Sequence, residues 1–269
     1  MTHGDHWAAI DPDHERLIEE MLSVVGTKGR VVGRSNTVVG DGERQWESEV
    51  VGLRYPADPL GFLGLVVARD GRREMWTAFP HAEGRSRSTL IVERIEPEGN
   101  GIEAVIHVGM PDAGGFSVSD PLYFLDKDHL EEGREAAFRL SAVAYGLRKC
   151  EPVSLTGGPL FEMLREEYLE ENPDRDPAEV TAIPISVAGT ACLFPEEDAD
   201  AQVMFRVDEV YTFDCGRPVT RLSGVVMRSG EDRELRIDVY ASAPALDGYV
   251  PRVGDEVQAV VWMQGVLDR

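Results

Sequence analysis

Lysine is almost absent from this 269-residue chain, where it occurs only at positions 28, 127 and 149. Asp and Glu number 49 against 27 Lys and Arg, which gives a formal net charge of −22 at pH 7. A negative field of this size repels nucleic-acid phosphates and anionic lipid surfaces over a Debye length of about 8 Å. The charge therefore disfavours nucleic acid and membranes as partners, and it favours cations or basic proteins.

Cysteine and long apolar runs are also scarce. The three cysteines, Cys150, Cys192 and Cys215, are too far apart in the sequence for a C-x-x-C metal or redox motif. A small, odd number of cysteines is typical of a reducing compartment. The longest nearly apolar run, 60–68, has about half of the length that a membrane-spanning helix needs. We therefore expect a cytoplasmic protein that does not enter a membrane.

Motifs of catalysis and nucleotide binding are missing as well. The chain contains no G-x-S-x-G, no phosphate-binding loop, no H-E-x-x-H and no S-x-x-K. The segment 99–104, GNGIEA, resembles a dinucleotide fingerprint in letters only, because a strand pattern follows it instead of a helix. The acidic segments 126–132 and 196–200 fit either solvated loops or a loose cation site, and they lack EF-hand spacing. We predict no cofactor and no resident metal.

What the chain does contain is a pattern of many short strands with few helices. Asp11-Pro12 begins a predicted helix with apolar residues at helical spacing, which ends at Gly26. From residue 28 to 150 the apolar residues recur with a period near two, as in antiparallel β-structure. The strands expected there are 31–39, 46–55, 62–68, 74–79, 89–96, 102–110, 122–125 and 136–147.

A second helix and a second strand-rich part follow. Apolar residues at 160, 161, 164 and 168 predict a helix that ends near 172 and carries an acidic opposite face. Five strands are then expected at 182–194, 201–213, 219–227, 234–241 and 256–267. Five strands in about ninety residues suit a small Greek-key barrel of the OB (oligonucleotide/oligosaccharide-binding) kind.

The predicted fold class is therefore mainly β (α+β), with two antiparallel β-rich lobes. Residues 1–150 form one lobe with the N-terminal helix, 151–180 are a linker with the amphipathic helix, and 181–269 form the OB-like barrel. The segments 129–147 and 249–267 resemble each other in having a glycine turn, an acid and a long apolar strand. We expect each of these late strands to close its own lobe.

Four residues are candidates for a binding surface: Trp262, Tyr211, Arg221 and His107. Trp262 shares a strand face with two residues that point away from the apolar row, so it is expected to contact another protein or the other lobe. Tyr211 and Arg221 lie on barrel strands, where OB folds stack bases, although core packing is the alternative for Tyr211. His107 is expected opposite the apolar face of its strand, and His81 in a loop.

Three functions are compatible with these patterns. The first is a non-enzymatic acidic interaction module that binds a basic protein or a cationic partner, or that self-associates. The second is a hydrolase or isomerase that uses a histidine (81, 107 or 129) and a carboxylate between the lobes. The third, an OB-type oligonucleotide binder, is disfavoured by the charge and needs a continuous positive stripe across Arg206, Arg221 and Arg236.

Overall fold

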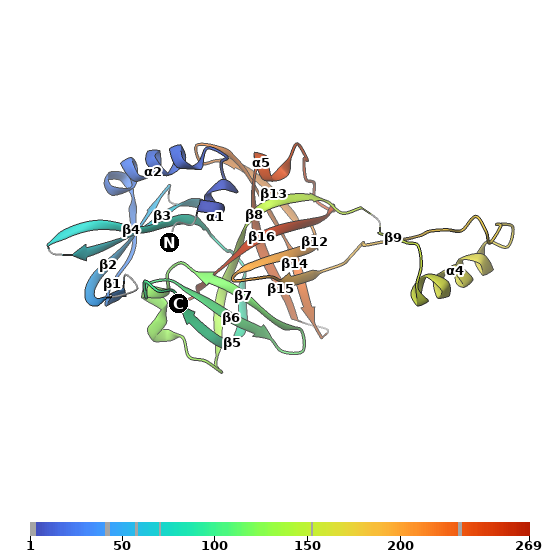
Figure 1. Cartoon of the computed structure of the whole chain (residues 1–269), viewed down its shortest axis with the longest axis horizontal. Coiled ribbons are helices and arrows are strands. Elements are labelled where there is room, and N and C mark those ends of the chain that lie inside the picture. Colours follow the sequence, from blue (N-terminus) through green and yellow to red (C-terminus); the bar gives the residue numbers. More distant parts are fainter. Residues whose placement is uncertain (1–3, 41–43, 57–58, 70, 152, 231–232) are drawn as a thin grey trace.

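The computed structural model describes residues 4–40, 44–56, 59–69, 71–151, 153–230 and 233–269. The chain is built mostly of antiparallel strands with few helices, which confirms the predicted mainly β, OB-like class. A four-stranded sheet lies at one end, a strand-rich body occupies the middle and an arm projects from the other end (Figure 1). No helix within the described ranges is long and apolar enough to cross a membrane.

Two helices begin the chain. Helix α1 (Gly4–Ala8) is short, and α2 (His14–Lys28) packs on strands β2 and β3 with its buried residues Leu17 and Val25. The helix continues past the predicted stop at Gly26 and ends instead at Gly29, whose extended backbone breaks the helical path. A side chain at Gly29 would lie 2.3 Å from the Val25 carbonyl oxygen, so glycine is required at this exit.

The four-stranded sheet is a simple meander in the order β1-β2-β3-β4. Its strands are β1 (Arg30–Gly40), β2 (Gln45–Tyr55), β3 (Leu60–Arg69) and β4 (Arg72–Ala82). Alternate side chains of β2 lie on opposite faces of the sheet, and neither set is purely apolar in the sequence. In the structure the set that includes Val50 and Arg54 is the buried one and faces the body. This choice follows from β3 and β4, because Val50 and Arg54 share their sheet face with Leu63 and Phe79.

Five strands close into a barrel in the order β16-β7-β6-β5-β8, with β8 paired back to β16. They are β5 (Arg87–Pro97), β6 (Ala104–Met110), β7 (Gly114–Asp120), β8 (Glu135–Lys149) and β16 (Glu256–Leu267). A closed ring leaves no free edge among its members. A closed five-stranded barrel is therefore confirmed, but its predicted position at 181–269 is wrong, because four of its strands come from residues 87–149.

The two late strands that resemble each other do not close separate lobes. Strands β8 and β16 pair with each other in antiparallel register, from Lys149 opposite Val257 to Phe138 opposite Leu267. Both strands extend beyond the ring, and the surplus length carries the remaining strands of a ten-stranded sheet. The pairing brings the C-terminal strand into the barrel because two long apolar strands bury more surface together than either does alone.

The outer strands lie on both sides of this central pair. Strands β15, β14 and β13 extend the sheet from β8, and β12 and β11 extend it from β16. Their bounds are β11 (Cys192–Pro195), β12 (Asp200–Arg206), β13 (Glu209–Asp214), β14 (Pro218–Ser229) and β15 (Arg233–Ser242). The strand predicted at 201–213 is thus two strands, separated at Val207 and Asp208.

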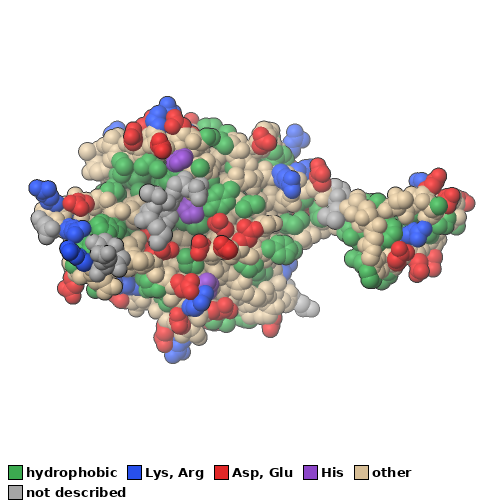
Figure 2. Space-filling view, viewed as in Figure 1, with side chains coloured by type: hydrophobic (Ala, Val, Ile, Leu, Met, Phe, Trp, Pro, Cys, Tyr) green, Lys and Arg blue, Asp and Glu red, His purple; other side chains and the backbone are tan. Residues whose placement is uncertain are grey.

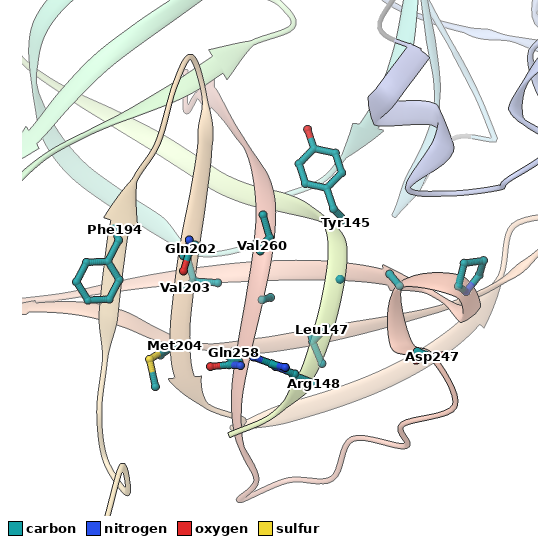
Figure 3. A pocket seen from close by; sticks show the side chains of 14 residues that line it. Tyr145, Leu147, Arg148, Phe194, Gln202, Val203, Met204, Asp247, Gln258 and Val260 are labelled. Atoms are coloured by element: carbon teal, nitrogen blue, oxygen red, sulfur yellow. The ribbon is translucent and has the colours of Figure 1, made fainter. Parts of the chain in front are cut away.

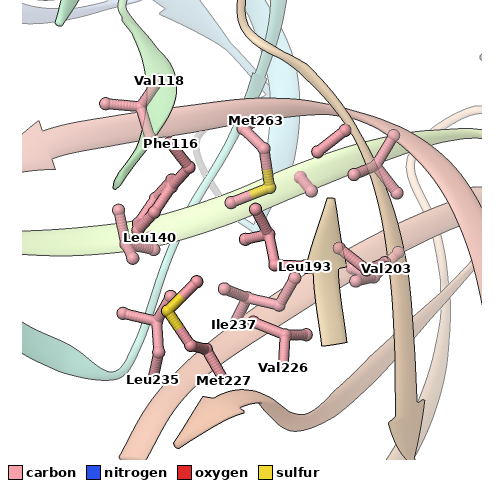
Figure 4. Packing of buried hydrophobic residues seen from close by; sticks show 14 of the residues in the cluster. Phe116, Val118, Leu140, Leu193, Val203, Val226, Met227, Leu235, Ile237 and Met263 are labelled. Atoms are coloured by element: carbon pink, nitrogen blue, oxygen red, sulfur yellow. The ribbon is translucent and has the colours of Figure 1, made fainter. Parts of the chain in front are cut away.

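Apolar side chains from the ring and from the outer strands form one continuous core. Phe116, Val118, Leu140 and Met263 of the ring point toward residues of β14 and β15 such as Ile237 (Figure 4). All of these except Phe116, at 3%, are 0% exposed, and burying each aliphatic side chain is worth about 1.5–3 kcal/mol. Barrel and outer strands therefore stabilise each other.

Three short elements differ from the prediction or connect the parts. The strand expected at 122–125 is the helix α3 (Tyr123–Asp126), which continues into a 3-10 turn, η1 (Lys127–His129). The turn that precedes α3 forms because the Asp120 side chain accepts a hydrogen bond from the Leu122 amide at 2.9 Å. Strand β7 was not expected, since its GGFSVSD sequence has little apolar content. Helix α5 (Ala243–Leu246) follows β15.

The arm contains a two-stranded ribbon and a helix. Strands β9 (Val153–Leu155) and β10 (Ile183–Ile185) pair with each other, and α4 (Pro159–Glu171) lies beyond them. The predicted connecting helix is therefore confirmed, and Figure 1 shows that it stands away from the body. Phe161 and Ile183, 6% and 8% exposed, anchor the helix to its own ribbon.

Candidate functional site

His107 lies on the outer face of the barrel beside two side chains that sequence reasoning did not connect with it. Ser117 Oγ is 2.9 Å from His107 Nδ1, and His107 Nε2 is 3.0 Å from Glu96 Oε2. The contact follows from register, since His107 pairs with Ser117 on β7 and with Arg94 on β5. A serine, a histidine and a carboxylate in this order are the groups of nucleophilic acyl transfer.

The surroundings of this Ser117–His107–Glu96 ladder favour a surface network. Arg94 Nη2 lies 2.9 Å from His107 Nε2 and 3.1 Å from Glu96. Arg94 therefore competes with the Glu96 carboxylate for the same ring nitrogen of His107. The hydrogen bond from His107 lowers the pKa of Glu96, an exposed carboxylate. None of the four hollows described in this chain is lined by Ser117 or by a histidine. Ser117 therefore lies outside the hollows that are described in this chain.

His81 and His129 do not form a catalytic pair either. His81 lies in β4 rather than in a loop, at 6% exposure, with both ring nitrogens lacking a hydrogen-bond partner among the described residues. Burial, helped by the charge of Arg54, lowers its pKa to about 3, so the ring is neutral at physiological pH. His129 is exposed in η1. Neither of these two histidines faces a carboxylate inside a described hollow.

Tyr211 and Arg221 are brought together as a cross-strand pair of β13 and β14. The Arg221 guanidinium carbon lies 5.1 Å from the centre of the Tyr211 ring, a cation–π distance. Arg221 also lies 3.9 Å from the buried carboxylate of Asp238, which Arg85 binds at 3.0 Å. The hydrogen bond to Asp238 raises the pKa of Arg85.

These contacts remove the positive stripe that oligonucleotide binding needs. Arg221 is shared between Tyr211 and acidic groups, and Arg236 forms an ion pair with Asp208 at 2.5 Å. Arg206 lies in a hollow of about 220 Å³ whose lining includes Asp208 and a second acid. Each candidate cation therefore has carboxylates in its immediate neighbourhood, and phosphate binding is disfavoured.

Trp262 is buried at 3% exposure and contacts the N-terminal part of the chain. Its ring stacks on His6 with centroids 3.9 Å apart and planes inclined by 4°. His6 Nδ1 lies 2.7 Å from the Tyr145 hydroxyl, which donates to Asp200 Oδ1 at 3.0 Å. Trp262 was predicted to contact either another protein or the other lobe of this chain. The structure shows a contact within the chain.

The largest described hollow is a groove across strands β8, β12 and β16. It has a volume of about 580 Å³, within the range of small-molecule and peptide sites. Two exposed apolar side chains, Phe194 and Val260, stand on it, and Tyr145 rises at one end (Figure 3). The predicted face of β16 with Gln258 and Val260 therefore lines the groove, while Trp262 is covered.

The polar groups of the groove are suited to binding rather than to proton transfer. The Gln258 amide oxygen accepts from the Arg148 guanidinium, and Gln202 donates to Glu196 at 2.6 Å. Amides and a guanidinium do not exchange protons near neutral pH. The described lining holds one carboxylate, Asp247, and no histidine or cysteine to pair with it.

The arm presents the second exposed surface. Leu160 and Met163 on α4 are 50% and 58% exposed, although leucine and methionine usually lie in the core. Residues 153–185 carry eight acidic side chains against two arginines, a net charge of −6. Figure 2 shows carboxylates and apolar side chains side by side on the projecting part. This combination is typical of an interaction surface.

A pair of buried carboxyl groups lies between the meander and the barrel. Asp120 and Asp126 are both 0% exposed, and Arg269 Nε donates to Asp126 at 2.7 Å. Burial and the neighbouring carboxylate raise the pKa of Asp120 well above its usual value. The surroundings of Asp120 therefore favour its neutral, protonated form. No group of three or more metal-ligating side chains occurs within the described residues.

No protein-family model matches the chain, and no curated protein matches it. Among solved structures, the chain is similar to the cytoplasmic molybdate-binding protein ModG, in a PEG-grown form with molybdate bound. The two share 10% sequence identity, with a TM-score of 0.32, over 67% of this chain and 96% of ModG. A likeness of this size says nothing of a ligand in the present chain.

Proposed function

We propose that this protein is a non-enzymatic interaction module whose acidic arm binds a basic protein in the cytoplasm. The observation that carries the proposal is the exposure of Leu160 and Met163 on a helix surrounded by carboxylates. The three cysteines are free, which agrees with a reducing compartment.

The arm has the two features that protein recognition uses. Its charge of −6 attracts a basic surface and accelerates encounter, while the apolar side chains supply the contact that holds the complex. Leu160 and Met163 are three residues apart, so they lie on one side of the helix. A partner that buries both recovers about 1.5–3 kcal/mol for each side chain.

A basic amphipathic helix is the simplest probe of this surface. Fluorescence anisotropy of the full chain with the labelled peptide KLLKKLLKKLLKK is expected to show saturable binding that weakens as salt is added. The matched peptide ELLEELLEELLEE is expected to bind at least tenfold more weakly. Equal affinity for the two peptides contradicts the proposal.

Substitutions on the arm locate the binding. The double variant Leu160→Ser, Met163→Ser is expected to lose at least tenfold in affinity, which corresponds to about 1.4 kcal/mol. The control is Leu22→Ser, which changes an exposed apolar residue on α2, outside the arm. If the double variant and the control variant both bind the basic peptide as tightly as the parent protein, the arm is not the binding surface.

The Ser117–His107–Glu96 ladder supports a second candidate function, a serine hydrolase. The two candidates differ in one chemical test, covalent labelling by a fluorophosphonate that reacts with activated serines. The interaction module is expected to remain unlabelled. Labelling that is lost in Ser117→Ala and kept in Ser119→Ala identifies a hydrolase instead.

A further inference from the structure

Strand β13, Glu209–Asp214, is the last strand of the ten-stranded sheet. Among the described strands it pairs only with β14. In an antiparallel edge strand, alternate residues turn their N–H and C=O groups away from the neighbouring strand. Four of its six residues are exposed, so this outer row of hydrogen-bonding groups is accessible.

The other three edges of the four-stranded and ten-stranded sheets each carry a feature that hinders pairing along part of the strand. Strand β11 has only four residues and ends at Pro195. The free edge of β4 is occupied by the Gln264 side chain, which accepts from the Ala82 amide at 2.9 Å and donates to the Pro80 carbonyl at 2.7 Å. Strand β1 has an irregular register between Val31 and Gly33. Short strands, covered edges, prolines and bulges are the usual protections against edge-to-edge association.

Strand β13 has none of these protections. Its sequence, EVYTFD, contains no proline, glycine or lysine, and its register with β14 is uninterrupted. Valine, tyrosine, threonine and phenylalanine are all strong strand formers. An edge with regular geometry and high strand propensity is suited to accept one more strand.

The face of β13 that carries the exposed Tyr211 ring adds a platform for apolar side chains. The rings of Tyr211 and Phe213 stack with centroids 6.0 Å apart, and Tyr211 is 53% exposed. Arg221 lies against the Tyr211 ring and holds it in place. Cross-strand neighbours on such a face stabilise paired strands.

Charge selects the occupant of the edge. Antiparallel pairing of two copies about Thr212 would bring Glu209 of one copy beside Asp214 of the other, one residue out of register, between two molecules of net charge −22. Like charges this close in paired strands are unfavourable. A lysine or arginine in the added strand would instead lie near Asp214, and near Glu209, whose carboxylate also pairs with Arg85 at 2.8 Å.

We propose that the free edge of β13 binds an extended segment of a partner protein, with basic residues at its ends, as an added strand. Main-chain hydrogen bonds would supply affinity, and the alternating side chains would supply selectivity. This surface is separate from the arm, so the inference does not depend on the arm's function.

The geometry of Thr212 provides a sharp test. The hydroxyl oxygens of Thr212 and Thr220 are 3.1 Å apart, a close approach typical of a non-hydrogen-bonded pair. The N–H of Thr212 then points outward, and Thr212→Pro removes it while the β13–β14 hydrogen bonds remain. The matched control, Thr212→Val, keeps the backbone donor and the strand propensity.

The probe is the labelled peptide acetyl-KTVTVTVK-amide, measured by fluorescence anisotropy against the full chain. It is expected to bind at least tenfold more tightly than acetyl-ETVTVTVE-amide, and N-methylation of alternate amides is expected to abolish binding. Thr212→Pro is expected to weaken binding at least tenfold, and Thr212→Val to leave it unchanged. Leu160→Ser, Met163→Ser on the arm should also leave it unchanged.

A second variant covers the case in which Thr212→Pro fails to fold, as judged by circular dichroism. Asp214 accepts a hydrogen bond from the Gly216 amide and forms no ion pair within the described residues. Asp214→Lys is therefore expected to weaken the binding of the basic peptide about fivefold or more. The proposal is overturned by absence of saturable binding, by equal binding of acidic and basic peptides, or by equal binding to Thr212→Pro and Thr212→Val. A dimer in sedimentation that Thr212→Pro dissociates assigns the edge to a second copy and overturns it too.

Discussion

Gln264 and Ala82 are joined by a hydrogen bond of 2.9 Å between the Gln264 side-chain oxygen and the Ala82 amide, 182 residues apart in the chain. The same side chain donates to the Pro80 carbonyl, so one fully buried amide bonds both main-chain groups at the last residues of β4. The meander and the barrel are connected at this point by polar contacts, which require defined geometry.

Gln264→Leu is expected to destabilise the protein by about 2–4 kcal/mol. The substitution leaves the Ala82 N–H and the Pro80 C=O buried without partners, and each such group costs about 1–3 kcal/mol. Urea denaturation followed by circular dichroism measures the change. Gln258→Leu, in the open groove, is the control and should change the stability by less than about 0.5 kcal/mol.

His6→Ala is expected to cost about 1–3 kcal/mol. The variant loses the stacking on Trp262 and the hydrogen bond with Tyr145, each of which contributes about 0.5–1.5 kcal/mol. Thermal unfolding detects the loss, and limited proteolysis should show faster cleavage near α1. His14→Ala is the matched control. A result in which both variants unfold like the parent excludes a docking role for His6.

Asp120→Asn is expected to be more stable than the parent at pH 8, and the difference should disappear near pH 3. Because the folded-state pKa of Asp120 is raised, the parent loses stability as the pH rises from about 4 through that pKa. Asparagine is similar in size to aspartate and does not titrate. The gain at pH 8 is the free energy that the parent loses when Asp120 ionises in its buried position.

The free energy of unfolding at several pH values tests this linkage. Asp128→Asn, at an exposed neighbouring position, should follow the parent throughout the range. A gain for Asp120→Asn that is the same at every pH would show that packing, not ionisation, is responsible.

His81 gives the opposite pH dependence. Its pKa of about 3 lies below the value of 6.5 in the unfolded chain, so the folded state binds fewer protons and loses stability as the pH falls below 6.5. Between pH 7.5 and pH 5 this histidine should cost about 2 kcal/mol. His81→Leu is expected to lack that part of the acid sensitivity, while His129→Leu, at an exposed site, should retain it. Parallel urea titrations at the two pH values make the comparison.

Several features could be predicted from local sequence because they depend on short-range periodicity. The helices α2 and α4, the strands of the meander and the mainly β class all follow from spacings of two or about 3.6 residues. The outward position of His107 also follows from strand alternation. The helical conformation of segment 122–125 could not be predicted, since four apolar residues fit a strand or a helix equally. The hydrogen bond from the Leu122 amide to Asp120 favours the turn that begins the helix.

The sequence by itself determined the element types, the acidic surface and the apolar faces, because these properties belong to residues and their near neighbours. Only the tertiary structure decided which strands pair. The strand pairing in turn decided which side chains meet at the sites described above. His6 of α1 covers Trp262, the β6–β7 register brings Ser117 to His107, and the last position in the sheet leaves β13 with a free edge. Such contacts join residues far apart in the chain, and their register is set by the burial of whole strands, which no local pattern encodes.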